Sequence, residues 1–120
     1  EGIGWSLVID SSKTDFPVLI GGECHSTEIT KTEWISLVPT IMELLDQFDE
    51  YQKGFVSDES FILEIEKQSW RICLEGLNDQ WTLKVILEST SGRRGFQMYW
   101  PIPSAKAFTS AMRIMWDSYQ

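Results

Sequence analysis

The sequence between residues 61 and 100 decides the fold, and it reads FILEIEKQSWRICLEGLNDQWTLKVILESTSGRRGFQMYW. Apolar and polar side chains alternate along four short runs of this stretch, at residues 61–66, 70–75, 81–87 and 96–100. Alternation with a period of two is typical of a strand that is buried on one face only. Because the four runs follow one another closely, we predict a four-stranded antiparallel meander, with the rest of the chain packed against it as a second layer.

The need to bury the apolar side chains on one face sets the expected register of the meander. Pairing Ile65 with Trp70 keeps both side chains inside, whereas a slip by one residue would bury charged side chains. The inner face is then predicted to hold the rows Ile65–Trp70–Val85–Met98 and Leu63–Ile72–Leu83–Trp100. The outer face is predicted to hold the row Glu64–Arg71–Lys84–Tyr99, beside a second row of Ile62, Cys73 and Thr82.

A capping box marks the start of the first helix, after three further predicted strands at residues 5–10, 16–20 and 23–29. In the sequence Thr30-Lys-Thr-Glu33, the side chains of Thr30 and Glu33 can each accept a hydrogen bond from the other's backbone amide. The helix is predicted to run from Lys31 to about Tyr51, kinked by Pro39, with Gly54 ending the region. Its apolar stripe is Trp34, Val38, Ile41, Leu45 and Phe48, with Leu37 and Leu44 beside it.

A second helix is expected after the meander. Pro101 and Pro103 break the chain, and Ser104 is placed to cap a helix that runs to about Asp117. The order of strands, helix, strands and helix predicts an α+β fold of two pseudo-symmetric sheet-plus-helix units. The length of 120 residues predicts that residues 1–120 form a single domain.

The charge and the cysteine content exclude several classes of protein. A net charge of −8 argues against broad non-specific binding to nucleic acid or to anionic membranes. Cys24 and Cys73 have neither metal nor redox spacing, and no run of 18 apolar residues suggests a membrane span. We therefore expect a cytoplasmic protein without a membrane partner.

Catalytic motifs are not evident. His25 is the only histidine, so a single chain cannot form a site with several histidine ligands. Glu64, Glu66 and Glu75 could share the outer face, where a close pair of carboxylates could serve acid–base catalysis. Ordinary surface ion pairs are the simpler interpretation of these residues. We predict no catalytic residue, no metal and no cofactor.

The most distinctive loop covers residues 91–95, where glycines flank Arg93 and Arg94. Glycine amides and arginine side chains suit the recognition of phosphate or carboxylate groups. Arg71 and Lys84 would extend these charges into a strip on the outer face, and Tyr99 would lie beside them. A solvated turn on a solvated sheet face is the alternative interpretation.

Several short motifs occur in an order that resembles a known family. They are Gly4-Trp5, Leu19-Ile-Gly-Gly22, Glu28-Ile-Thr-x-x-Glu33-Trp34, Leu83-x-x-Ile86-Leu87, Gly92-Arg-Arg94 and Trp100-Pro101. Together they resemble the cyanobacterial family called domain of unknown function 1818. The resemblance implies the fold of single-stranded-DNA-binding transcription regulators such as the plant Whirly proteins, and a cyanobacterial cytoplasm. It transfers no catalytic residue.

These observations favour a non-enzymatic protein-interaction or regulatory module, either a monomer or a homodimer. Its outer sheet face and the Arg93–Arg94 hairpin would contact an acidic protein partner, with Tyr99 and Trp81 as candidate aromatic anchors. The alternative is single-stranded nucleic-acid binding, in which the four cations meet phosphates and Tyr99 stacks on a base. The net charge, and the lack of the lysine-rich strand found in Whirly proteins, disfavour this alternative. An enzyme of unknown type is the third possibility.

Overall fold

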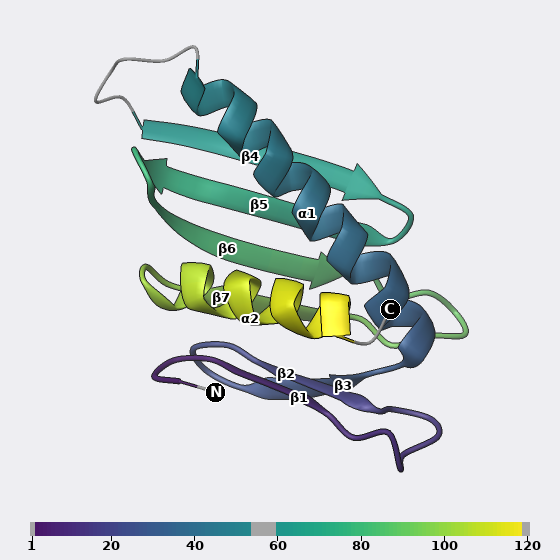
Figure 1. Cartoon of the computed structure of the whole chain (residues 1–120). Helices are drawn as coiled ribbons and strands as arrows, with labels where there is room; N and C mark the ends of the chain where they lie inside the picture. The colour runs from purple at the N-terminus through teal and green to yellow at the C-terminus, as the bar shows by residue number, and fades with distance from the viewer. Residues whose placement is uncertain (1, 54–59, 119–120) are drawn as a thin grey trace.

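The computed structural model describes residues 2–53 and 60–118, which form two antiparallel sheets and two helices (Figure 1). The order of strands, helix, strands and helix confirms the predicted α+β class. Gly54, expected to end the first helix region, lies outside the described residues. The elements are β1 (Ser6–Ile9), β2 (Val18–Gly21), β3 (Ser26–Ile29), α1 (Lys31–Lys53), β4 (Ser60–Lys67), β5 (Trp70–Leu77), β6 (Gln80–Leu87), β7 (Phe96–Trp100) and α2 (Ser104–Ser118).

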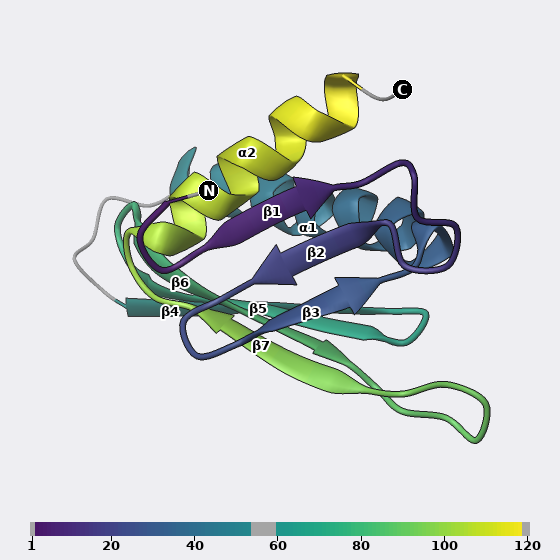
Figure 2. The same ribbon diagram turned by 90° about the horizontal axis from the view of Figure 1, so that it is seen from below.

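The four-stranded sheet has the order β4-β5-β6-β7, so the predicted meander is confirmed. The first three strands form a separate sheet in the order β1-β2-β3. Both helices lie on the same side of the four-stranded sheet (Figure 1). Helix α1 crosses the strands, and α2 packs against β6 and β7. Seen from below, the other side of this sheet is covered by no described helix or strand (Figure 2). That uncovered side is the outer face.

The predicted register is wrong by two residues in the first two hairpins. Lys67, not Ile65, pairs with Trp70, because the β4–β5 turn contains only two residues. Likewise, Trp70 pairs with Leu87, and a second two-residue turn joins β5 to β6. The first turn residues, Gln68 and Asn78, have φ values of 59° and 56°, a region that short hairpin turns need.

A slip by two residues leaves every side chain on its predicted face, so the inner face is as expected. The β6–β7 pairs Val85–Met98 and Leu83–Trp100 are confirmed. The other inner pairs change to Ile65–Ile72, Leu63–Leu74, Ile72–Val85 and Leu74–Leu83.

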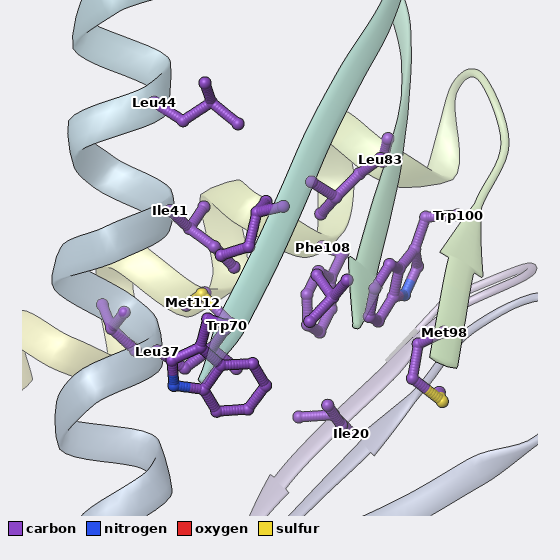
Figure 3. Close-up of a cluster of buried hydrophobic side chains, with 14 of the residues drawn as sticks. Ile20, Leu37, Ile41, Leu44, Trp70, Leu83, Met98, Trp100, Phe108 and Met112 are labelled. Carbon is purple, nitrogen blue, oxygen red and sulfur yellow. The ribbon is translucent and has the colours of Figure 1, made fainter. Parts of the chain in front are cut away.

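One hydrophobic core joins both sheets and both helices (Figure 3). Trp100 of β7 stacks on Phe108 of α2, with ring centroids 4.2 Å apart and planes inclined by 15°. In the described part of the chain, twelve large side chains are almost completely removed from solvent, among them Leu37, Leu83 and Met112. Each such side chain contributes roughly 1.5–3 kcal/mol through burial, so this core is the main source of stability.

Helix α1 begins with the predicted capping box. The amide of Thr30 donates to Glu33 Oε1 at 2.9 Å, and the amide of Glu33 donates to Thr30 Oγ1 at 3.0 Å. The helix continues through Pro39 to Lys53. Its apolar stripe differs from the prediction in one detail, because Leu44 is fully buried and Leu45 only half-buried.

The turn between β2 and β3 attaches the first sheet to β7. Trp100 Nε1 donates to the carbonyl oxygen of Gly21 at 2.8 Å, and the amide of Glu23 donates to the carbonyl oxygen of Tyr99 at 2.9 Å. A Cβ atom on Gly22 would lie 2.6 Å from that same Tyr99 oxygen. The close approach of the two backbones therefore requires glycine at position 22.

Candidate functional site

The outer face of the four-stranded sheet carries the candidate binding residues Arg71, Lys84 and Tyr99. Cross-strand pairing arranges its side chains in three rows, Ile62–Glu75–Thr82, Glu64–Cys73–Lys84–Tyr99 and Glu66–Arg71–Ile86–Gln97. Each strand contributes one apolar side chain, and successive ones are diagonal neighbours across the sheet. We call this set the outer band; it consists of Ile62, Cys73, Ile86 and Tyr99.

The two ends of the outer band are open to solvent. Ile62 is 64% exposed and Tyr99 39% exposed, whereas Cys73 in the middle is buried. Burial raises the pKa of the Cys73 thiol above its usual value, and the nearby Glu64 carboxylate acts in the same direction. Cys73 therefore forms a closed floor at the centre of the face, between Glu64 and Lys84 of its row, with exposed apolar side chains at either edge.

Arg71 is paired on the outer face with two carboxylates. Its guanidinium lies 3.1 Å from Glu66 and 3.4 Å from Glu88. The predicted row placed Arg71 opposite Glu64 and Lys84. Both placements are wrong, because in the observed register Arg71 lies opposite Glu66 and Ile86. All three side chains of the observed cluster are about half-exposed, so the cluster adds little stability and remains accessible to a partner.

Lys84 and Tyr99 form a directly opposed cross-strand pair, as predicted. Among the residues that the structure describes, Lys84 has no ion-pair partner. The Tyr99 backbone accepts the hydrogen bond from Glu23, so the position of this strand is set by the contact with the first sheet. A free ammonium and an exposed aromatic ring thus lie side by side on a rigid strand pair.

Arg94 lies on the helix side of the four-stranded sheet, away from Arg71 and Lys84. Its guanidinium donates two hydrogen bonds to the Glu33 carboxylate, Nη1 to Oε2 at 3.0 Å and Nη2 to Oε1 at 3.2 Å, and a further one to the carbonyl oxygen of Glu28. It also lies over the rings of Phe16 and Phe96, 5.0 and 5.6 Å from their centroids. The Arg94 side chain is therefore engaged in contacts within the molecule.

The Arg94–Glu33 pair also changes the acidity of Glu33. Burial alone would raise the pKa of this carboxyl group. The hydrogen bonds from Arg94 and from the Thr30 amide outweigh burial, and the pKa of Glu33 lies below its usual value. Glu33 thus has two structural tasks, because it caps α1 and holds the β6–β7 hairpin. The capping motif revealed the first task, but no local signal pointed to the second.

Arg93 takes a different direction from Arg94. It is half-buried, and its Nη2 donates to the carbonyl oxygen of Glu88. Its Nε is buried without a partner among the described residues. Arg94 therefore does not combine with Arg71 and Lys84 into one basic strip, and Arg93 bonds the backbone of Glu88, whose carboxylate pairs with Arg71.

The charge of the outer face is acidic overall. Among the residues that the structure describes, this face carries four carboxylates, Glu64, Glu66, Glu75 and Glu88, and two cations, Arg71 and Lys84. Trp81, considered as an aromatic anchor, belongs to the inner face and is 4% exposed. Of the two aromatic candidates, only Tyr99 is available to a partner.

The chain belongs to the family described as "Domain of unknown function (DUF1818)", whose model matches residues 1–115. It is similar to a crystal structure from Prochlorococcus sp. NATL2A, described as a protein with unknown function from the DUF155 family. The two chains are 42% identical, the alignment covers 97% of this chain and 96% of the other, and the TM-score is 0.88. No curated protein matched the chain.

Within the described residues, neither helix has an apolar stretch of the length needed to cross a bilayer. In the same residues, no three His, Cys, Asp or Glu side chains gather in a way that would hold a metal ion.

Proposed function

We propose that this protein is a non-enzymatic interaction module that binds a protein partner through the outer face of its four-stranded sheet. The observation that carries the proposal is the outer band, in which exposed Ile62 and Tyr99 flank a closed floor on a face that no described element covers. Exposed apolar and aromatic side chains within a polar rim are typical of protein contact sites. The four strands hold these side chains in place, so little conformational entropy is lost when a partner binds.

The charge of this face indicates the kind of partner. With four carboxylates and two cations, of which Arg71 is already paired twice, the rim complements basic side chains. The proposed partner therefore presents apolar and basic residues, rather than the acidic surface expected from the sequence. Tyr99 is the proposed anchor residue, because tyrosine often contributes much of the binding free energy at such sites.

A matched pair of variants tests the proposal in extracts of the source organism. Tagged wild-type protein is compared with Ile62→Ser/Tyr99→Ser and with Ile114→Ser, which removes an isoleucine of nearly equal exposure from α2 (66% against 64%). A partner that binds wild type and Ile114→Ser, and binds the outer-band variant about tenfold more weakly after purification, supports the proposal. Equal binding to all three proteins contradicts it.

A second candidate function, single-stranded nucleic-acid binding, is favoured by the opposed pair of Lys84 and Tyr99. A cation beside an exposed ring is the minimal arrangement for holding a phosphate and stacking a base. The family resemblance of the sequence also implies a fold like that of the Whirly-type regulators, which bind single-stranded DNA, and this implication supports the candidate. The acidic outer face and the internal engagement of Arg94 count against this function.

Titration into labelled single-stranded DNA and RNA distinguishes this candidate. The anisotropy is read at low and then physiological salt, for wild type and for Lys84→Gln/Tyr99→Ser. Binding that weakens steeply with salt and is lost in the variant supports nucleic-acid recognition at this face. The absence of binding at low salt would exclude this candidate and leave the protein-interaction proposal intact.

The family resemblance supports the remaining parts of the proposal. We propose a cyanobacterial origin and a cytoplasmic location, with the protein present as a monomer or a homodimer.

A further inference from the structure

A groove of about 500 Å³ lies between α1, α2 and the β5–β6 turn, on the opposite side of the four-stranded sheet from the outer face. We call it the interhelical groove. Its apolar wall includes Leu45 and Phe48 of α1, Trp81 of β6 and Ile114 of α2, and its charged groups include Asp49 and Arg113. The volume lies within the range of sites that hold small molecules.

Arg113 is an exposed cation of this groove that lacks a strong acceptor. The Trp81 indole N–H is buried and has no hydrogen-bond partner among the described residues. The Arg113 guanidinium makes its only described hydrogen bonds, at 3.1 and 3.2 Å, to the thioether sulfur of Met42. Thioether sulfur is a weak acceptor, so the charge of Arg113 is not neutralised.

The other charged residues of the groove differ in whether they have an ion-pair partner. Lys106 lies 3.3 Å from Asp79, so these two groove residues neutralise each other. Asp49 has no ion-pair partner among the described residues, and its charge opposes that of Arg113. The groove therefore offers one unneutralised cation and one unneutralised anion beside aromatic and aliphatic walls. An anionic group can accept two hydrogen bonds at once from the Arg113 guanidinium, whose described hydrogen bonds go only to a thioether, so Arg113 favours an anionic ligand.

We propose that the interhelical groove binds a small molecule that carries an anionic group on an apolar, aromatic-sized body. Arg113 pairs with the anionic group, and Phe48, Trp81 and Ile114 contact the body. Asp49 lowers the affinity for a simple anion, so its removal strengthens binding. This site is separate from the outer face and does not depend on a protein or nucleic-acid partner there.

Fluorescence titration with anilinonaphthalene sulfonate, an aromatic body bearing one sulfonate, tests this site under native conditions. The probe is added to the full chain as wild type and as Arg113→Gln, Asp49→Asn and Arg71→Gln, with circular dichroism confirming that each variant is folded. Arg71→Gln is the matched control, because it removes one positive charge from the outer face. The neutral analogue phenylnaphthylamine measures the apolar contribution alone.

The expected result is one saturable site in the wild type. Arg113→Gln should weaken sulfonate binding about tenfold, as expected for the loss of a charge-assisted contact. Asp49→Asn should strengthen it, Arg71→Gln should leave it unchanged, and none of the three should change binding of the neutral analogue by as much. The proposal is overturned if no saturable site is found, if Arg113→Gln and Arg71→Gln behave alike, or if Asp49→Asn fails to strengthen sulfonate binding.

Discussion

The guanidinium of Arg94 and the carboxylate of Glu33 form a two-point contact between parts of the chain that are 61 residues apart. This contact joins the β6–β7 hairpin to the first turn of α1, and through the carbonyl oxygen of Glu28 it also reaches the end of β3. The hairpin, the helix and the first sheet are therefore held together at one point. Arg94 belongs to this junction and not to the outer face.

Replacing Arg94 by Gln should destabilise the protein by about 2 kcal/mol, because the buried Glu33 carboxylate loses its charged partner. Only 9% of the Glu33 side chain is exposed, against about half of each side chain around Arg71. Arg71→Gln is therefore the control, and it should cost less than about 1 kcal/mol. Urea unfolding measures both values. Equal losses in the two variants would contradict the structural role of Arg94.

The stability contributed by Glu33 should depend on pH. Its pKa in the folded protein is lower than the ordinary value of 4.5, so the folded state favours the charged carboxylate. This contribution is fully present above pH 4.5 and is lost as the pH falls through the lower folded pKa. The difference in unfolding free energy between wild type and Glu33→Gln should therefore be constant near neutrality and shrink below pH 4.5. A difference that grows on acidification would show that the sign of the pKa shift is wrong.

Two glycine substitutions separate the contact between the sheets from general effects of alanine. In Gly22→Ala the new methyl group would lie 2.6 Å from the backbone oxygen of Tyr99. A methyl group at position 92 would have no atom beyond its chain neighbours within 4 Å. Gly22→Ala should cost about 2 kcal/mol, because neither backbone can move without breaking the Glu23–Tyr99 hydrogen bond. Thermal unfolding should show little change for Gly92→Ala. A mild Gly22→Ala variant would mean that the two sheets are not in close contact there.

The two cysteines should differ strongly in reactivity. Cys24 is exposed, whereas Cys73 is buried between Glu64 and Lys84 and has a raised pKa. Because the thiolate is the reactive form, a disulfide reagent at pH 8 should modify Cys24 quickly and Cys73 only on unfolding. The thiolate that the reagent releases, followed against time, measures the rate at which each cysteine is modified. The Cys24→Ser variant is the control. Rapid modification of Cys73 in the folded protein would contradict the closed floor of the outer band.

The sequence predicted the faces of the four-stranded sheet but not its register, and the reason is geometric. Alternation with a period of two places Leu83 inside and Lys84 outside in any register shifted by two residues. The length of the turns decides between these registers. Asn78-Asp79 has the composition of a tight turn, whereas Gln68 gives no such signal although it adopts the same positive φ.

The candidate site was predictable only in part for a related reason. Arg71, Lys84 and Tyr99 lie on strands, so their common face follows from alternation. Arg94 lies in a loop, and its partner Glu33 is in a distant helix, so no local pattern connects them. The interhelical groove likewise depends on how α2 packs beside α1, which periodicity in either helix does not specify.

Site-specific photo-crosslinking in the source organism tests the proposed outer-face interaction most directly. A photoreactive phenylalanine analogue, which keeps an aromatic ring, replaces the anchor Tyr99 on the outer face or, as the control, the exposed Gln47 on α1. We predict a discrete crosslinked protein from position 99, absent from position 47 and reduced when Ile62→Ser is added. Equal crosslinking from both positions, or crosslinks from position 47 alone, would contradict the proposal that the outer sheet face binds the partner.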